Sequence, residues 1–368
     1  MTTQSHRART LLLDAAARLF ADGATEEVQE QVEDGTFPRE LWSAIEDNGL
    51  PLALVPEDAG GVGLGVPDAM AVLRLAGAFA LPLPLAETML GQWALASAGL
   101  PAAEGPLCVA PGDPRDHFEV ERDSARGWIV SGRAPRVSWA SPGARCVLVC
   151  SETATGGSRI ALVTPGPHEL APSRNPAGES QASLVLESHM VADGNIAAAP
   201  PGLDGHRLLE LFALARTALM AGALERVLDL TLEHAQGRVQ FGKPIGRFQA
   251  VQQQVAELAG ESAIVGAALE AAAAAVEENA EGASFAVAAA KARASTAAEP
   301  ACAIAHQLHA AIGFTREHVL HRFTRRLWAW RDEAGSESFW WQRAGEQILE
   351  GGGAGLWPRI CGEVSEAS

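Results

Sequence analysis

The sequence is short of cysteine, of positive charge and of long apolar runs, and each shortage excludes a class of function. Its 368 residues include five cysteines, an odd number, with no pair at the C-x-x-C spacing of metal and redox sites. This usage predicts buried, reduced thiols in a reducing cytoplasm. Lysine and arginine total 28 against 45 acidic residues, and the net charge of −17 argues against nucleic acid or an anionic membrane as a partner.

The sequence also lacks a recognisable signal peptide or membrane span. Its first residues lead into a helical pattern that contains Asp14 and Arg18, which interrupt any signal-peptide core. The alanine-rich runs further along are cut by Glu and Lys before they reach the ~18 to 20 apolar residues of a membrane-spanning helix. We therefore expect a cytoplasmic protein with no membrane span and with two or three domains.

Hydrophobic periodicity divides the chain into four segments. Residues 1–105 carry apolar stripes at the three-and-four spacing of helices, and residues 106–202 alternate in short runs bounded by Gly, Pro or Ser. Residues 203–352 are helical again, and residues 353–368 form an acidic tail. Breaks in the second helical segment are expected at 236–247, 279–283, 298–300 and 312–315. The pattern predicts an α+β protein with an N-terminal helical domain, a β-barrel-like middle domain and a C-terminal four-helix bundle.

One corner of the second helical segment, from Arg238 to Ala250, has the composition of an anion site. It gathers two helix breakers, two cations, an amide and an aromatic ring: Gly242, Pro244, Arg238, Lys243, Gln240 and Phe241. A guanidinium makes forked, charge-assisted hydrogen bonds to phosphate oxygens, and an aromatic face can cover a flat ring. The alternative is a solvated loop between two helices.

The order Arg-x-Gln-Phe-Gly-Lys-Pro-Ile-x-x-Phe-Gln-x-x-Gln, from Arg238 to Gln252, resembles the signature of the acyl-CoA dehydrogenase family without a gap. The resemblance implies an FAD flavoprotein that acts on acyl-CoA, with this corner reaching the FAD of a neighbouring subunit. It places Arg238 on the pyrophosphate, with Gln240 and Phe241 beside the adenosine half, and includes Gln249 in the cofactor-binding motif. It further implies a homo- or heteromeric dimer of dimers and an acceptor like electron-transfer flavoprotein.

A second stretch, from His306 to His318, resembles the family segment Gln-x-x-Gly-Gly-x-Gly-Phe. Gln307 and Gly313 match it and are implied to contact the ADP part of FAD, whereas alanines replace the first two glycines, a modest steric penalty. Four histidines lie in or beside this stretch: His306, His309, His318 and His321. We do not favour a metal site there, because the i, i+3 pairs have no nearby cysteine or clear third ligand.

Two earlier stretches also resemble the family. Residues 54–65 are glycine-rich, but their spacing is not G-x-G-x-x-G and no strand leads into them, so a dinucleotide loop is not favoured. They resemble instead the family loop Pro-Glu-x-x-Gly-Gly-x-Gly. Residues 132–140 stand where the family carries Gly-x-Lys-x-Trp-Ile-Thr-Asn, whose Trp and Thr meet the flavin ring. Ser138 keeps the threonine hydroxyl, whereas Arg136 replaces the tryptophan and 109–114 replaces the usual acidic and hydroxyl loop.

The implied chemistry needs a carboxylate that takes the proton α to a thioester carbonyl while hydride leaves the β-carbon. Counted from Gly313, the family's Glu-Gly-Thr position falls on Ala334-Gly335-Ser336, so the usual base is absent. Some relatives keep the base on the first bundle helix, at about residue 212 or 213 here, where no carboxylate stands. The candidates are Glu333 and Glu210, and for each the alternative is a solvated or salt-bridged helix residue.

Two functions follow from the resemblance. The first is an acyl-CoA dehydrogenase that forms a 2,3-enoyl-CoA with a displaced base. The second is a catalytically silent subunit that completes the FAD site of an active paralogue.

A cluster of aromatic residues near the C-terminus lies among arginines and phenylalanines: Trp328, Trp330, Trp340 and Trp341. We interpret this cluster as a subunit interface rather than an adenine-nucleotide site.

Overall fold

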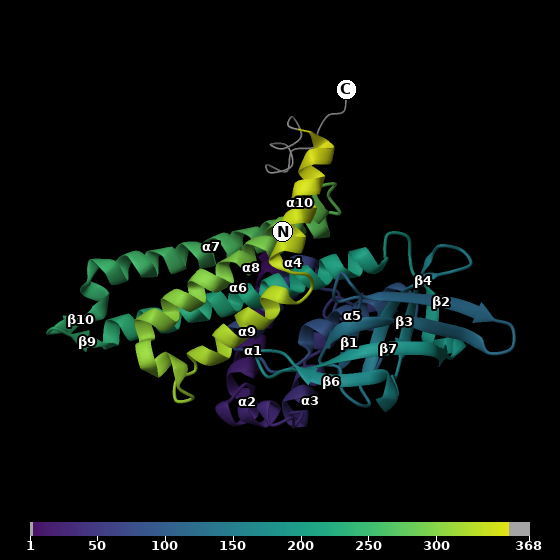
Figure 1. Ribbon diagram of the computed structural model, residues 1–368, viewed down its shortest axis with the longest axis horizontal. Coiled ribbons are helices and arrows are strands. Elements are labelled where there is room, and N and C mark those ends of the chain that lie inside the picture. The colour runs from purple at the N-terminus through teal and green to yellow at the C-terminus, as the bar shows by residue number, and fades with distance from the viewer. Residues whose placement is uncertain (1–2, 353–368) are drawn as a thin grey trace. The chain divides into compact units, whose positions relative to one another are not determined.

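The computed structural model describes residues 3–352, which fall into two compact units (Figure 1). The first, here called the bundle unit, comprises residues 3–17, 70–81 and 213–352 of the described chain. The second, here called the sheet unit, comprises Arg18–Ala69 and Pro82–Phe212. The C-terminal tail expected at 353–368, with Cys361, lies outside the described residues.

The sheet unit begins with the end of α1 (Thr3–Gly23) and includes three short helices: α2 (Glu26–Glu33), α3 (Arg39–Asp47) and α5 (Leu85–Ser97). In sequence, α4 (Val66–Ala78) lies between α3 and α5, and its residues from Met70 onward belong to the bundle unit. Helix α3 buries Leu41, Trp42 and Ile45 on one face, as the three-and-four spacing predicts. Helix α5 is fixed to the first strand, because the Thr88 hydroxyl accepts the Leu107 amide at 3.0 Å. A helix of the N-terminal segment thus packs on the sheet.

The eight strands of the sheet unit pair in the order β6-β7-β3-β2-β4-β5-β8, with β1 beside β4. Their bounds are β1 (Leu107–Ala110), β2 (His117–Asp123), β3 (Gly127–Ser138), β4 (Arg145–Glu152), β5 (Ser158–Val163), β6 (Leu170–Arg174), β7 (Ser180–Val191) and β8 (Ile196–Ala198). Alternate residues, such as Phe118 and Val120 on β2, face a buried core. The register of β3 against β7 shifts between Ala134 and Val137, so the strand bends where Arg136 stands.

Long helices form the bundle unit: α6 (Gly205–Gly237, from residue 213 onward), α7 (Gln249–Glu277), α8 (Ala283–His309), α9 (Leu320–Asp332) and α10 (Glu337–Gly351). Figure 1 shows α7 and α8 running side by side. Two glycines let α4 and α6 cross closely, because a Cβ on Gly77 or Gly222 would lie 2.0 or 1.8 Å from a backbone oxygen of the other helix. The α+β architecture predicted from the sequence is confirmed.

Two local expectations about the helices need correction. The predicted break at 298–300 is wrong, because α8 runs through with Pro300 inside it. Proline removes one backbone hydrogen bond there, and burial of the surrounding alanines offsets the loss. Helix α7 is long and apolar enough, by length and composition, to be a candidate membrane span, contrary to our expectation. One face of α7, which includes Leu258, Val265 and Leu269, is buried, and the helix packs along α8.

Candidate functional site

The corner between α6 and α7 is a tight hairpin that projects Phe241. Strands β9 (Val239–Gln240) and β10 (Lys243–Pro244) pair across a two-residue turn. Both turn residues have left-handed φ, 51° at Phe241 and 78° at Gly242, as a type I′ turn requires. The Phe241 side chain is 93% exposed, and Lys243 Nζ lies 4.4 Å from the ring centre of Phe248.

This hairpin and the start of α7 present hydrogen-bond donors that have no partner within the described residues. Arg238, Gln240 and Gln249 are exposed, and within residues 3–352 none of their side chains forms an ion pair or hydrogen bond. A free guanidinium, two free amides and an exposed ring can hold a nucleotide diphosphate. The chemistry of these side chains therefore fits the ADP half of FAD.

Stacked histidine rings connect this hairpin to the end of α8. His234, in the last turn of α6, stacks on His309 at 4.5 Å between ring centres, and His309 meets His318 at 4.7 Å. Burial, and then the neighbouring His309, lowers the pKa of His234 and His318. Within residues 3–352 no three His, Cys, Asp or Glu side chains are placed to share a metal ion.

The histidine stack brings the second family-like stretch beside the hairpin. Gln307 is exposed on the last turn of α8 and has no side-chain partner in the described chain. Gly313 is buried, and a Cβ there would lie 2.9 Å from the His309 Cβ. Gly313 is therefore required by packing beneath the histidines, whatever its part in cofactor binding.

The turn between α9 and α10 is held by a buried ion pair that the sequence did not reveal. Glu333, the first candidate base, ends α9 at 9% exposure and accepts Arg216 Nε at 2.8 Å; Arg216 is only 1% exposed. Lys291, fully buried on α8, donates to Ser295 Oγ at 2.9 Å and to the carbonyls of Arg331 and Gly335 at 2.9 and 3.2 Å. Burial lowers the pKa of Lys291 to about 7, despite the opposing charges of Asp332 and Glu333.

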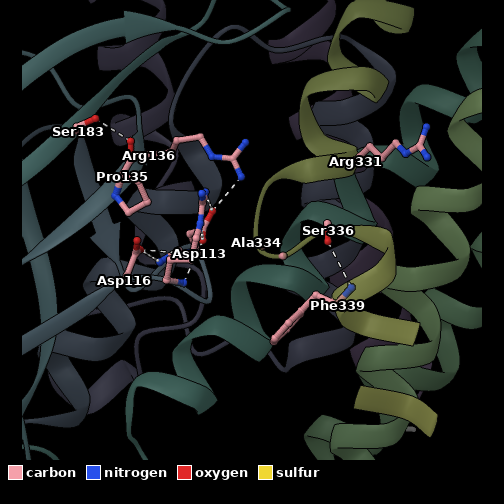
Figure 2. A network of polar contacts seen from close by, with 12 residues as sticks. Asp113, Asp116, Pro135, Arg136, Ser183, Arg331, Ala334, Ser336 and Phe339 are labelled. Atoms are coloured by element: carbon pink, nitrogen blue, oxygen red, sulfur yellow. Dashed lines mark hydrogen bonds and ion pairs between the residues drawn. The ribbon is translucent and has the colours of Figure 1, made fainter. Parts of the chain in front are cut away.

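Ala334 occupies the position at which the family resemblance implies a catalytic glutamate. Its side chain is fully buried, its φ is 55°, and its carbonyl accepts Trp340 Nε1 at 2.7 Å. Ser336 then caps α10 by accepting the Phe339 amide (Figure 2). At this turn residue 334 contributes a methyl group and no carboxylate.

In the sheet unit, Arg136 is paired with an acidic loop that our sequence analysis did not identify. Asp113, 5% exposed, accepts Arg136 Nη2 at 2.9 Å and Arg115 Nε at 2.8 Å (Figure 2). Burial opposes ionisation, yet these bonds lower the pKa of Asp113 to about 2. The spacing of Asp113, Arg115 and Asp116 along 109–116 could have indicated a charged loop at this position.

Asp116 closes the same loop from the other side. Its Oδ2 accepts the amides of Gly112 at 2.7 Å and Asp113 at 3.0 Å, while its Oδ1 is buried without a partner among residues 3–352. Burial raises the pKa of Asp116 to about 7, against those two amide bonds. The loop is thus held by its own hydrogen bonds, and Asp113 forms an ion pair with Arg136 at the position where the family resemblance implies a tryptophan.

The remaining predicted residues lie in ordinary surroundings. Ser138 ends β3 opposite Gln181 on β7 and is half-buried. Glu210, 14% exposed, pairs with Arg207 at 3.3 Å one turn away on α6. For Trp330 and Trp340 the interface interpretation is wrong, because they are 3% and 2% exposed and pack inside the bundle unit. Trp328 and Trp341, 41% and 47% exposed, stay available for a partner.

Comparison with known proteins gives a consistent relationship over most of the chain. Residues 7–104 match the family model "Acyl-CoA dehydrogenase, N-terminal domain", and residues 206–349 match "Acyl-CoA dehydrogenase, C-terminal domain". The chain is 29% identical to acyl-CoA dehydrogenase IpdE2 of Mycobacterium tuberculosis, with 80% of this chain and 81% of that protein covered.

Two solved structures are similar over nearly their whole length. One is the ChsE4-ChsE5 complex from Mycobacterium tuberculosis, at 26% identity and a TM-score of 0.83, covering 95% of this chain and 98% of the other. The second is a variant of the steroid ACAD Tcur3481-Tcur3483, at 25% identity and a TM-score of 0.83, covering 94% and 99%.

Proposed function

Since the chain belongs to the acyl-CoA dehydrogenase family, we propose that it is an FAD-dependent oxidoreductase that converts an acyl-CoA thioester to its 2,3-enoyl-CoA. The observation that carries this proposal is the hairpin at Arg238, whose donors are exposed and unpaired within the described chain. A solvated loop would satisfy the composition, but it gives no reason for a guanidinium and two amides without partners in the described chain to lie in one corner with a ring that is 93% exposed.

The residues of this chain divide the work between binding and proton transfer. Bound FAD would supply the hydride acceptor. Arg238 would hold the pyrophosphate through charge-assisted hydrogen bonds, while Phe241 covers a flat ring and Gln240, Gln249 and Gln307 supply neutral hydrogen bonds. Gly313 would let the backbone of residues 306–314 approach the ADP part of FAD. Ser138, at the end of β3, would offer its hydroxyl to the flavin ring.

We rank the two candidate bases by their surroundings. Glu333 is held in the interior by Arg216, and a buried carboxylate with a fixed partner is poorly placed to meet a substrate. Glu210 is more exposed than Glu333, and it pairs at 3.3 Å with Arg207 on its own helix rather than with a fully buried cation. Glu210 is therefore the stronger candidate for the group that takes the α-proton.

The alternative function is a catalytically silent subunit that completes the FAD site of an active paralogue. The methyl group of Ala334 at the base position favours it, as does the Arg136–Asp113 pair in place of an aromatic flavin wall. One similar structure is a complex of two different chains, so a heteromer has a structural precedent. In both versions the assembly is a dimer of dimers in the cytoplasm, with an acceptor like electron-transfer flavoprotein.

Anaerobic flavin bleaching separates the two functions. The protein is purified alone and with a co-expressed paralogue, and then mixed with short, branched and polycyclic acyl-CoAs; the last group is included because one similar structure is a steroid enzyme. Glu210→Gln and Glu333→Gln keep the side-chain shape and remove the proton acceptor, and loss of a general base costs ~10² to 10⁴ in rate. Bleaching by the wild type that disappears in Glu210→Gln supports the enzyme.

The opposite pattern supports the silent subunit. In that case the wild type does not bleach alone, the mixture with the paralogue does, and both glutamine variants leave the mixed activity intact. Absence of flavin from every preparation would contradict both functions.

A further inference from the structure

The sheet unit contains a cavity of about 570 Å³ that the proposed flavin chemistry does not use. Its walls come from the segment before α3, from α3 itself, from the start of β1 and from the loop that follows β3. None of the residues assigned above to FAD binding or to proton transfer lines it. A volume of this size is within the ordinary range of small-molecule sites, which is roughly 300 to 1,000 Å³.

The cavity wall is positively charged in a protein whose overall charge is −17. Its charged lining residues are Arg39, Arg174 and Glu46. The Arg174 head is fixed by the carbonyls of Val32 at 3.3 Å and Gly178 at 2.7 Å, and Gly35 leaves room for it, since a Cβ there would lie 2.9 Å from Nη2. A preorganised cation on a concave wall favours an anion.

The second cation stands at an open helix end. Arg39 begins α3, is exposed, and forms no ion pair with another residue in the described range 3–352. Pro38 precedes it without a side-chain cap, so the first amides of α3 add partial positive charge. The one acid of the lining, Glu46, already accepts the Gly105 amide at 3.1 Å.

Aromatic rings line the rest of the cavity, and one of them carries an unsatisfied donor. Phe37, Trp42 and Trp139 all contribute to the wall. Trp42 is 4% exposed, and its indole N–H is buried without a hydrogen-bond partner in the part of the chain that the structure describes. A buried donor without a partner lowers stability unless a water or a ligand satisfies it.

We propose that this cavity binds a small organic anion, with its flat ring body among Phe37, Trp42 and Trp139 and its carboxylate toward Arg39 and Arg174. The two arginines favour an anion, because the one acid of the lining, Glu46, already accepts a backbone amide. The three aromatic rings favour a flat apolar body. The site is independent of the acyl-CoA reaction, so either proposal can fail without the other.

The test uses 8-anilinonaphthalene-1-sulfonate, a fluorescent flat anion, with the full chain. We expect saturable binding at one site per chain, with energy transfer from tryptophan. Ser43→Trp, at an exposed α3 position on the cavity wall, should fill the cavity and abolish this binding. Arg39→Gln should weaken probe binding by about 3- to 10-fold, because the ion pair between the exposed Arg39 and the probe's anion is partly solvated.

Matched controls make the result specific. Arg126→Gln, at an exposed arginine in the β2–β3 turn of the same unit, should leave the affinity unchanged. 2-Naphthoate should displace the probe, and the neutral 2-naphthylmethanol should compete far more weakly. Circular dichroism checks that each variant is folded. If Arg39→Gln is not folded, the result for Ser43→Trp decides the test. Probe binding that survives Ser43→Trp, or no saturable binding by the wild type, overturns the proposal.

Discussion

Arg216 on α6 and Glu333 at the end of α9 form a buried ion pair, with Arg216 Nε 2.8 Å from the Glu333 carboxylate. The two residues lie 117 positions apart in sequence, and their ion pair joins α6 to the turn that contains Ala334. Because the Glu333 carboxylate is already held by Arg216 and stabilises the fold, we rank Glu210 above it as the group that takes the proton.

Removing one partner of this pair should be costly. Arg216→Met leaves the Glu333 carboxylate buried without its cation, and we expect the free energy of unfolding to fall by about 3 to 5 kcal/mol. The double variant Arg216→Met with Glu333→Leu replaces both charges by apolar groups and should recover most of the loss. Urea unfolding of the single and double variants measures both effects. Equal loss in the two would contradict a buried pair.

Asp116 should make stability fall as the pH rises towards neutrality. Its folded pKa is raised to about 7, so the native protein holds a proton that the unfolded chain releases above about pH 4. This stabilisation is full below the unfolded pKa and is lost as the pH rises through 7. Asp116→Asn cannot titrate and should remove a slope of up to about 1.4 kcal/mol per pH unit.

Urea unfolding at several pH values between 4 and 8 measures that slope. Asp123→Asn is the matched control, because Asp123 also accepts two backbone amides but is only half-buried, and these bonds lower its pKa instead. Because Asp123 titrates below pH 4, its removal should leave the slope between pH 4 and 8 nearly unchanged. Identical profiles for Asp116→Asn and the wild type would show that Asp116 is ionised in the native state.

Lys291 should have its effect at alkaline pH. Burial lowers its pKa to about 7, so between pH 7 and the ordinary lysine value of 10.5 the unfolded chain binds more protons than the native protein. Stability attributable to Lys291 therefore rises with pH across this window. Lys291→Met should flatten the rise, whereas Lys243→Met, at the exposed lysine of the hairpin, should not.

Arg238 should contribute to flavin retention. Arg238→Ala removes a charge-assisted hydrogen bond and should weaken FAD binding by roughly 1.5 to 3 kcal/mol, measured by flavin absorbance after dialysis. Arg247→Ala is the control, because Arg247 is exposed in the same corner at a position outside the family motif. Equal flavin loss in the two variants would point to a general charge effect rather than to a specific contact.

The fold could be predicted because its signals are local. Alternation along 106–202 and three-and-four spacing elsewhere report which face of each element is buried. The motif residues at 238–249 could be identified because they lie next to one another in sequence. The break expected at Pro300 was wrong, because a local signal was overridden by packing that the sequence does not show.

The polar contacts could not be predicted because they join distant segments. Lys291 lies in an alanine-rich helix and meets carbonyls 40 and 44 residues further along, and a single cation among alanines was its one local sign. Arg136 and Asp113 are 23 residues apart and meet through the pairing of β3 with β2. Such pairs depend on register and helix crossing, which periodicity does not specify.

Ala334→Glu should decide whether a missing carboxylate is all that separates this chain from an active enzyme. The family resemblance, counted from Gly313, implies that the base would stand at residue 334. Alanine already has a Cβ at its φ of 55°, so the new cost is side-chain space in a fully buried position. Ala334→Gln has the same size without proton acceptance and is the matched control. Urea unfolding of both variants reports whether each keeps the stability of a fold in which the Trp340 indole donates to the Ala334 carbonyl. If the chain binds acyl-CoA and FAD productively, Ala334→Glu should bleach flavin ~10² to 10⁴ times faster than Ala334→Gln. Equal rates in the two folded variants would mean that the catalytic arrangement differs from the family's in more than this one residue.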